Sequence, residues 1–249
     1  RGGPLSAGSS QWWRVEPSAI RMVPWGGAAQ PASTDQWVSS EGELLMASSP
    51  RRPRSYRLQQ GVSSVGWQQQ LPQPRDRALP PDQLPRLQAL GRTWRDQSMD
   101  VDRLAAAEAW FRSQPFRYSL APGAFVDLDA FLFDQQVGFC GHYAGALAAL
   151  MRAADVPSRV VSGYQGGRLV RPLGGSPYLD LRQSDAHAWV EVWLTGQGWK
   201  RVDPTRWAGS GQPGDQSIDA VVSSQAGPVP WWRWLQWQPY AARRFGKGR

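Results

Sequence analysis

The order of two hydrophobic periodicities limits the possible folds of this chain more than any other feature. Between residues 81 and 154, apolar residues recur three and four positions apart, as they do on one face of a helix. Between residues 159 and 203, apolar and polar residues alternate, as they do in half-buried strands. Helices that are followed by an antiparallel sheet form an α+β domain, and we predict that fold class.

The helical part contains three predicted helices. The first begins near Pro81, the second is capped by Asp100 or Asp102, and the third begins at Cys140. Each predicted helix has apolar residues along one face, which can bury that face in a core. These residues are Leu84, Leu87, Leu90 and Trp94 in the first helix, Leu104, Ala107 and Phe111 in the second, and Ala144, Leu147, Ala148 and Met151 in the third.

The strand part contains a strand at 159–164, a turn at Gly166-Gly167 and a longer strand at 186–194. The sequence Thr-Gly-Gln-Gly at 195–198 predicts a hairpin turn, so residues 199–203 return antiparallel to the long strand. Side chains of a strand alternate between its two faces. One face of the long strand is expected to carry Ala188, Val190, Val192 and Leu194, and the other His187, Trp189, Glu191 and Trp193.

The register of this hairpin decides which residues can meet across it. If Trp193 pairs with Trp199, then Asp203 falls opposite Trp189, on the face that carries His187. Diagonal neighbours are then close enough for their side chains to touch. A slip of one residue would put Asp203 on the opposite face.

Prolines between residues 72 and 81 separate the helical part from what precedes it, because proline fixes φ and removes a backbone donor. Residues 1–75 contain short apolar pieces among Ser, Gly and Pro, which predict an irregular N-terminal unit with short strands. We expect a core domain at 76–210 and a C-terminal tail at 211–249.

The tail is rich in tryptophan from residue 228, and from residue 233 it carries basic but no acidic residues. This composition suits a position at a membrane interface. The alternative is a tail that packs on the domain or is disordered.

The single cysteine and two histidines among 249 residues exclude several kinds of site. One cysteine cannot form an internal disulfide or a cysteine-rich zinc site, and two histidines are too few for a histidine-based metal cluster. We expect no metal and no cofactor. The net charge of +8 comes from scattered arginines without a known nucleic-acid-binding motif, so nucleic acid is not an expected partner.

No uninterrupted apolar run approaches the ~18 residues of a membrane-spanning helix. The sequence begins Arg1-Gly2-Gly3-Pro4, without an initiator methionine or a signal peptide. We expect an excised fragment whose targeting information lies outside the sequence.

The stretch Gly-Phe-Cys-Gly-His-Tyr-Ala at 138–144 is the strongest candidate for chemistry. Cys140 lies where a turn becomes a helix, and the first N–H groups of a helix lack intrahelical partners. The positive end of the helix dipole favours a thiolate, and the Cys140 N–H can donate to an oxyanion. Taken alone, a cysteine in a helix rich in leucine and alanine is more often a small buried apolar residue.

The base that activates such a thiol must be one of two histidines. His142 is two residues along the same helix, and side chains at i and i+2 do not face each other, so we expect it to be structural or at the surface. His187 lies on a strand that can reach the start of a helix, and Asp203 can orient it. Taken singly, His187 can also be a hydrogen-bonded sheet residue and Asp203 a turn residue before Pro204.

Four stretches of the chain belong together: GFCGHYA at 138–144, RVVSGY at 159–164, DAHAWVEVW at 185–193 and GWKRVDPT at 198–205. In their order and spacing they resemble the transglutaminase-like superfamily. The similarity is dense between Leu104 and Thr205, and it is faint before Pro72 and after Ala208. It is greatest to the bacterial membrane-anchored type, in which this core is an extracytoplasmic domain between transmembrane segments.

The resemblance implies a papain-like fold with Cys140 as the nucleophile, His187 as the general base and acid, and Asp203 as the residue that orients His187. It also implies chemistry on amides. We predict acyl transfer from protein or peptide carboxamides through a thioester, with a primary amine or water as the acceptor. The alternatives are a peptidase or amidase on the same scaffold and, from another class, a non-catalytic scaffold that binds peptides or cell-wall polymer near a membrane.

The same resemblance predicts an extracytoplasmic, periplasmic domain of a membrane-anchored bacterial protein, with the membrane tether outside this fragment. The sequence departs from the family at Gly141, where many relatives have an acidic residue, and this implies a different pocket rim with the same three catalytic residues. A second oxyanion donor is not identified, and Gln135 and Gln136 are candidates by their proximity to Cys140 in the sequence.

Overall fold

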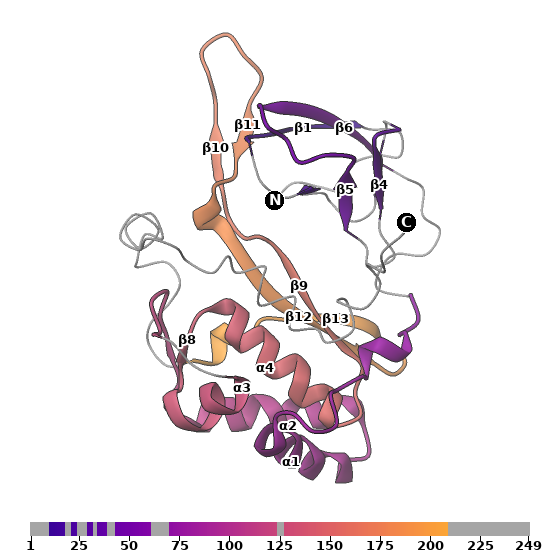
Figure 1. The fold of residues 1–249 in the computed structure, drawn as a ribbon, viewed down its shortest axis with the longest axis vertical. Helices are drawn as coiled ribbons and strands as arrows, with labels where there is room; N and C mark the ends of the chain where they lie inside the picture. Colours follow the sequence, from indigo (N-terminus) through magenta and orange to yellow (C-terminus); the bar gives the residue numbers. More distant parts are fainter. Residues whose placement is uncertain are drawn as a thin grey trace, which may run out of the picture. The chain divides into compact units, whose positions relative to one another are not determined.

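The computed structural model describes residues 10–17, 21–23, 29–31, 34–38, 43–60, 70–123 and 127–208. The chain divides into two compact units, Arg1–Gln70 and Leu71–Arg249 (Figure 1). The predicted tail at 211–249 lies outside the described residues.

The first unit consists of short antiparallel strands in two three-stranded sheets. Its small core contains Val23, Leu44, Met46, Tyr56 and Leu58, which are all buried. The strand order is β1-β6-β3 in one sheet and β2-β5-β4 in the other. The strands are β1 (Ser10–Val15), β2 (Met22–Val23), β3 (Ala29–Pro31), β4 (Gln36–Val38), β5 (Leu44–Met46) and β6 (Arg54–Gln60).

The second unit has the predicted order of helices and then an antiparallel sheet, which confirms the α+β class. The sheet order is β13-β12-β9, and in Figure 1 the helices gather on one side of its two long strands, β9 and β12. The helices are α1 (Pro85–Thr93), α2 (Asp100–Ser113), α3 (Leu128–Ala130), the π-helical η4 (Phe131–Gln135) and α4 (Cys140–Ala153), with 3-10 turns η2 (Pro74–Asp76), η3 (Trp94–Asp96), η5 (Gln183–Asp185) and η6 (Pro204–Trp207). The strands are β7 (Arg117–Tyr118), β8 (Val137–Gly138), β9 (Ser158–Tyr164), β10 (Arg168–Val170), β11 (Tyr178–Asp180), β12 (Ala186–Leu194) and β13 (Gly198–Val202).

Helix α4 is the centre of this unit because almost its whole surface is buried. It packs against α1 and α2 and against strands β9 and β12. Strand β12 contributes Val190 and Val192 to this core, and both are fully buried. Burial of large aliphatic side chains is the main stabilising term in folding, so this contact holds β12 on α4.

The N-terminus of α1 is capped by a residue distant in the sequence. Leu84 precedes the helix in the left-handed region at φ 56° and makes no side-chain cap. Instead, the buried Asp129 carboxylate accepts hydrogen bonds from the backbone N–H groups of Arg86 at 2.9 Å and Leu87 at 2.8 Å. This tertiary cap satisfies two donors that have no partner within the helix.

Helix α2 begins after Met99, so Asp100 lies in its first turn and is not the N-cap that the sequence suggested. The Asp100 carboxylate instead accepts hydrogen bonds from the Thr195 backbone N–H at 3.2 Å and hydroxyl at 2.6 Å. Asp100 therefore fastens the β12–β13 turn to α2.

Helices α1 and α4 approach most closely at Gly91. A Cβ at this position would lie 2.5 Å from the Ala153 Cβ and 2.7 Å from the Leu150 carbonyl oxygen. We expect Gly91→Ala to lower the free energy of unfolding by about 1–3 kcal/mol, because the helices would have to separate. Urea denaturation measures this change.

Gly145→Ala is the matched control, since the added methyl group would lie 3.7 Å from Leu128 in ordinary van der Waals contact. Alanine is favoured over glycine within a helix by about 1 kcal/mol, so this variant is expected to be neutral or more stable. Equal stability of the two variants would contradict a tight α1–α4 contact.

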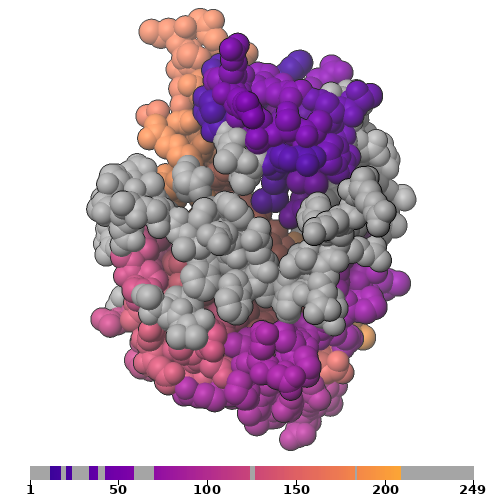
Figure 2. All heavy atoms as spheres, in the orientation of Figure 1, coloured from indigo at the N-terminus to yellow at the C-terminus, as the bar shows by residue number. Residues whose placement is uncertain are grey.

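The turn predicted at Gly166-Gly167 is the start of a longer excursion. Both glycines have positive φ, 103° and 98°, and the chain then forms the antiparallel hairpin β10–β11. The hairpin extends beyond the ends of β9 and β12 (Figure 1) and forms the orange projection in Figure 2. Its apolar residues Leu169, Leu173, Tyr178 and Leu179 are exposed.

Candidate active site

Cys140 is the first residue of α4, as predicted. Phe139 precedes it in an extended conformation, with φ −106° and ψ 178°, so the chain enters the helix by a sharp change of direction. The cysteine is a half-buried free thiol. Its side chain therefore lies at the positive end of a long, well-packed helix.

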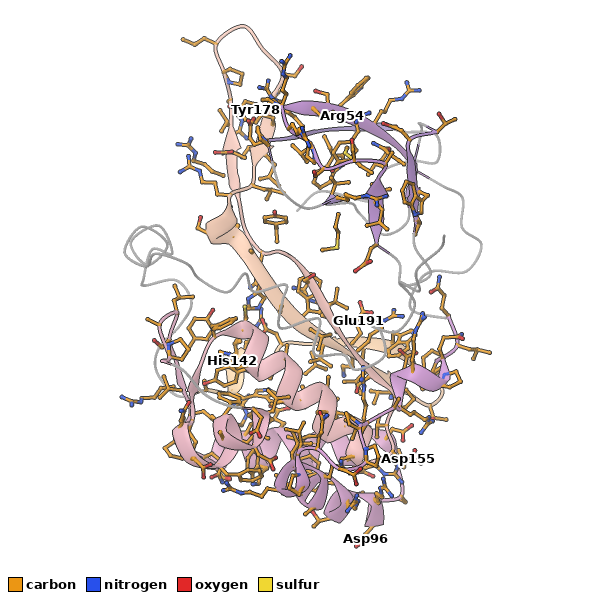
Figure 3. All side chains as sticks on the ribbon, in the orientation of Figure 1. Arg54, Asp96, His142, Asp155, Tyr178 and Glu191 are labelled. Carbon is orange, nitrogen blue, oxygen red and sulfur yellow. The ribbon has the colours of Figure 1, made fainter. Side chains whose placement is uncertain are left out.

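His142 is structural, which is one of the two outcomes expected for it. It is 2% exposed, and its Nδ1 accepts a hydrogen bond from the Phe139 backbone N–H at 3.1 Å. Burial lowers the pKa of His142 to about 3, so the ring is neutral at physiological pH. Figure 3 shows this residue at the start of α4, where it fixes the turn that presents Cys140.

The predicted hairpin register is confirmed. Trp193 lies opposite Trp199 and Val190 opposite Val202, so Asp203 directly follows the last paired residue. His187 Nε2 and Asp203 Oδ2 are 2.8 Å apart. The same register therefore brings His187, on β12, close to Asp203, which follows β13 and caps η6, and both side chains are nearly buried.

Asp203 is held in place by its own turn. Its Oδ1 accepts hydrogen bonds from the Thr205 backbone N–H at 3.2 Å and hydroxyl at 2.7 Å, which leaves Oδ2 for His187. Burial alone would raise the pKa of Asp203, but the hydrogen bonds from His187 and Thr205 and the charge of His187 outweigh it and lower the pKa. The carboxylate is therefore ionised at neutral pH.

Cys140 is the second group that acts on His187. Because Nε2 is used by Asp203, Nδ1 is the ring nitrogen that remains for the thiol. Burial alone would lower the pKa of His187, yet the hydrogen bonds to Asp203 and Cys140 and the charges of these two residues raise it to about 9. The ring is therefore protonated at neutral pH and can donate to a leaving group.

Trp189 and Trp207 have different surroundings. The Trp189 ring lies 6.5 Å from the His187 ring at an angle of 27°, and the Arg201 guanidinium lies 3.8 Å from the Trp189 ring centroid. Trp207 belongs to the core, where it packs on Phe111 at 5.6 Å. Trp189 therefore covers one side of His187, whereas Trp207 stabilises the domain.

The two glutamines that the sequence offered as oxyanion donors have different surroundings. Gln135 is exposed. The Gln136 side-chain amide donates to Gln114 Oε1 and to the Leu132 carbonyl oxygen, both at 3.4 Å. These partners turn the Gln136 amide toward η4 and α2.

Tyr118 lies beside the site and was not predicted from the sequence. Burial, followed by the charge of Cys140, raises the pKa of the Tyr118 hydroxyl above its usual range. Tyr118 lies on β7, a strand of two residues whose partner β8 precedes Cys140. The stretch Phe116-Arg117-Tyr118-Ser119 has the pattern of a short extended segment, but nothing in the sequence indicates that β8 is its partner.

Among the residues that the structure describes, no group of three or more His, Cys, Asp or Glu side chains could hold a metal ion. The same described residues include no helix that is long and apolar enough to cross a membrane.

Comparison with known proteins agrees with this geometry. The family model described as the transglutaminase-like superfamily matches residues 88–204. The structure is similar to the crystal structure of the periplasmic domain of TgpA from Pseudomonas aeruginosa bound to ethylmercury, with a TM-score of 0.66 and 36% identity over 83% of this chain and 78% of that chain. The chain belongs to the transglutaminase-like superfamily.

Two relatives are much longer than the sequence studied. The chain is 44% identical over 196 residues to a protein-glutamine gamma-glutamyltransferase of Pseudomonas aeruginosa, which covers 73% of this chain and 28% of that protein. It is 33% identical over 135 residues to the uncharacterized protein YebA of Bacillus subtilis, which covers 51% of this chain and 18% of that protein. The chain thus spans less than a third of the length of either relative.

Proposed function

We propose that this chain carries the catalytic domain of a protein-glutamine gamma-glutamyltransferase, in which Cys140 transfers the acyl group of a glutamine side chain to a primary amine. The name of the Pseudomonas aeruginosa relative supports the reaction class. The observation that carries the proposal is the placement of His187 between two partners, Asp203 at 2.8 Å and the Cys140 thiol.

The first half of the proposed reaction forms a thioester. The Cys140 thiolate attacks the carboxamide carbon, and the carbonyl electron pair moves to oxygen, where the Cys140 N–H donates to the resulting oxyanion. His187 then gives its proton to the amide nitrogen. The C–N bond breaks, ammonia leaves, and the acyl group stays on Cys140.

The second half returns the enzyme to its starting state. A primary amine attacks the thioester carbon while the now neutral His187 accepts the proton of the amine. The C–S bond breaks, and the thiolate is restored beside a protonated His187. Asp203 accepts the Nε2–H throughout and keeps the Nδ1 side of the ring turned to the sulfur.

We also propose that the domain is periplasmic and belongs to a membrane-anchored protein. Similarity to the periplasmic domain of TgpA supports this location. The tether would lie outside the described residues, and the basic, tryptophan-rich segment at 211–249 is a candidate for the part nearest the membrane.

The proposed reaction is tested with a glutamine-containing protein, a fluorescent primary amine and a parallel assay for ammonia. The expected result is amine incorporation together with ammonia release, both absent in Cys140→Ala. Ammonia release that proceeds equally without the amine would favour an amidase, and cleavage of the peptide chain would favour a peptidase. A Cys140 that iodoacetamide does not modify would exclude every enzymatic alternative and favour a binding scaffold.

A further inference from the structure

We propose that the first unit carries a binding site for a neutral saccharide, built around the exposed side chain of Trp12. The C–H face of one sugar ring lies on the indole, and the hydroxyl or acetamido groups of the sugar bind the polar side chains around it. The site does not depend on the acyl transfer proposed above, because all of its residues lie in the first unit.

An open cavity of about 280 Å³ marks the site. Strands β1 and β6 contribute Trp12, Arg54 and Arg57 to its lining, and the start of β4 contributes Asp35 and Gln36. This volume is close to the lower end of the range for small-molecule sites. The Arg54 guanidinium, labelled in Figure 3, forms an ion pair with the Asp35 carboxylate. Residues of both sheets are therefore joined at the cavity.

Trp12 supplies a flat apolar surface. The residue is 71% exposed, although an indole is large and mostly apolar. Trp12 lies opposite Arg57 in the register of β1 and β6, and the Arg57 guanidinium is 5.9 Å from the indole centroid. This cation–π contact orients the ring. The neighbouring Trp13 lies on the other face of β1, where it stacks on Tyr56 at 6.2 Å. The small core therefore has its own tryptophan, and Trp12 is available to a ligand.

Gln36 supplies an acceptor that lacks a donor. The residue is 6% exposed and lies opposite the fully buried Met46 in the register of β4 and β5. Its Oε1 is buried and has no hydrogen-bond partner among the described residues. A buried acceptor without a partner is destabilising. A glutamine at a core position that also lines a cavity therefore points to a ligand with an N–H or O–H group.

The mixed polarity of the lining favours a neutral sugar over an anion. Arg54 and Arg57 can donate hydrogen bonds, whereas Asp35 and Gln36 Oε1 can accept them. A sugar hydroxyl both donates and accepts, and an acetamido N–H donates. A phosphate or carboxylate group would use the arginines alone. It would also be repelled by the Asp35 carboxylate and would leave Gln36 Oε1 without a donor.

A titration of the 249-residue chain with chitotetraose, followed by ligand-observed NMR, tests the site. This neutral tetrasaccharide has both hydroxyl and acetamido N–H groups. We expect saturable binding with a dissociation constant of about 1 mM or lower. Trp12→Ala should weaken binding at least about tenfold, because it removes the central aromatic surface.

Gln36→Leu tests the buried acceptor with a side chain of similar size. Binding should again weaken at least about tenfold, because the donor of the sugar loses its partner. Stability in urea should stay equal or rise, since the variant removes a buried oxygen that has no partner among the described residues.

Trp37→Ala is the matched control. Trp37 is another exposed tryptophan of the first unit, with the Arg21 guanidinium 5.1 Å from its ring centroid. It does not line the cavity, so this variant should bind chitotetraose as the wild type does. Cys140→Ala should also bind normally, because the sugar does not occupy the active site.

Three results would overturn the proposal. The first is that chitotetraose, cellotetraose and maltotetraose all fail to bind at concentrations up to about 10 mM. The second is that Trp12→Ala binds the sugar as tightly as the wild type, which would place the sugar elsewhere. The third is that polyphosphate displaces the sugar from the wild type and binds far more tightly than it, with an affinity that falls steeply as salt is added, which would make the cavity an anion site.

Discussion

The His187→Ala variant is expected to lose acyl transfer by a factor of about 10⁴ to 10⁶, as when the base of a nucleophile–base pair is removed. Without the imidazole, the thiolate loses its cationic partner and the leaving nitrogen loses its proton donor. Iodoacetamide provides an independent measurement. Wild-type Cys140 should react at about pH 6 much faster than a free thiol, and this excess should disappear in His187→Ala.

Glu191→Gln is the control for this experiment. Glu191, labelled in Figure 3, lies four residues after His187 in β12, but its carboxylate is bound to Arg159 at 2.7 Å. An amide at this position can still accept from Arg159, so activity should be retained. If His187→Ala kept both its activity and its fast alkylation, His187 could not be the base.

The Asp203→Asn variant is expected to lower kcat by about 10² to 10⁴, because an amide neither fixes the His187 ring as the carboxylate does nor stabilises its charge. The pH profile gives a second readout. Folded His187 has its pKa raised to about 9 from 6.5, so wild-type activity should fall as the pH rises through about 9 and the ring loses its proton. In Asp203→Asn this limb should move to lower pH.

The free energy of unfolding should change with pH as His187 and Asp203 titrate, and the two residues act at opposite ends of the pH range. Because the pKa of His187 is raised in the folded state, its contribution is complete below about pH 6.5 and is lost as the pH rises through about 9. Because the pKa of Asp203 is lowered, its contribution is lost in acid instead. If the alkaline limb of the activity profile does not move in Asp203→Asn, a group other than His187 causes that limb.

The part of the site that follows from local rules was predictable from the sequence. Alternation along 186–194 and the short turn after it determine a register, and that register places Asp203 beside His187. The helix start at Cys140 follows from Gly138 and the apolar spacing beyond it. The buried position of His142 could not be predicted. The argument from helix faces indicates only that His142 is not the base. It does not reveal that the Phe139 backbone N–H needs a hydrogen-bond acceptor.

The missed features leave no local signal in the sequence. Tyr118 is placed near Cys140 by a parallel pairing of two-residue strands, which are too short to give any periodicity. Asp129 caps α1 from a different helix, so no signal lies near Leu84. The hairpin after Gly167 contains exposed apolar residues and has no buried face to mark its strands.

The order of the site residues along the chain has a consequence during synthesis. Cys140 leaves the ribosome before His187, and Asp203 comes later still. The hydrogen bond between His187 and Asp203 can form only after the chain has passed Asp203 and the Thr205 turn that holds it. In the growing chain, Cys140 is therefore present before its proposed base is oriented, and the proposed site is complete only when the domain is complete.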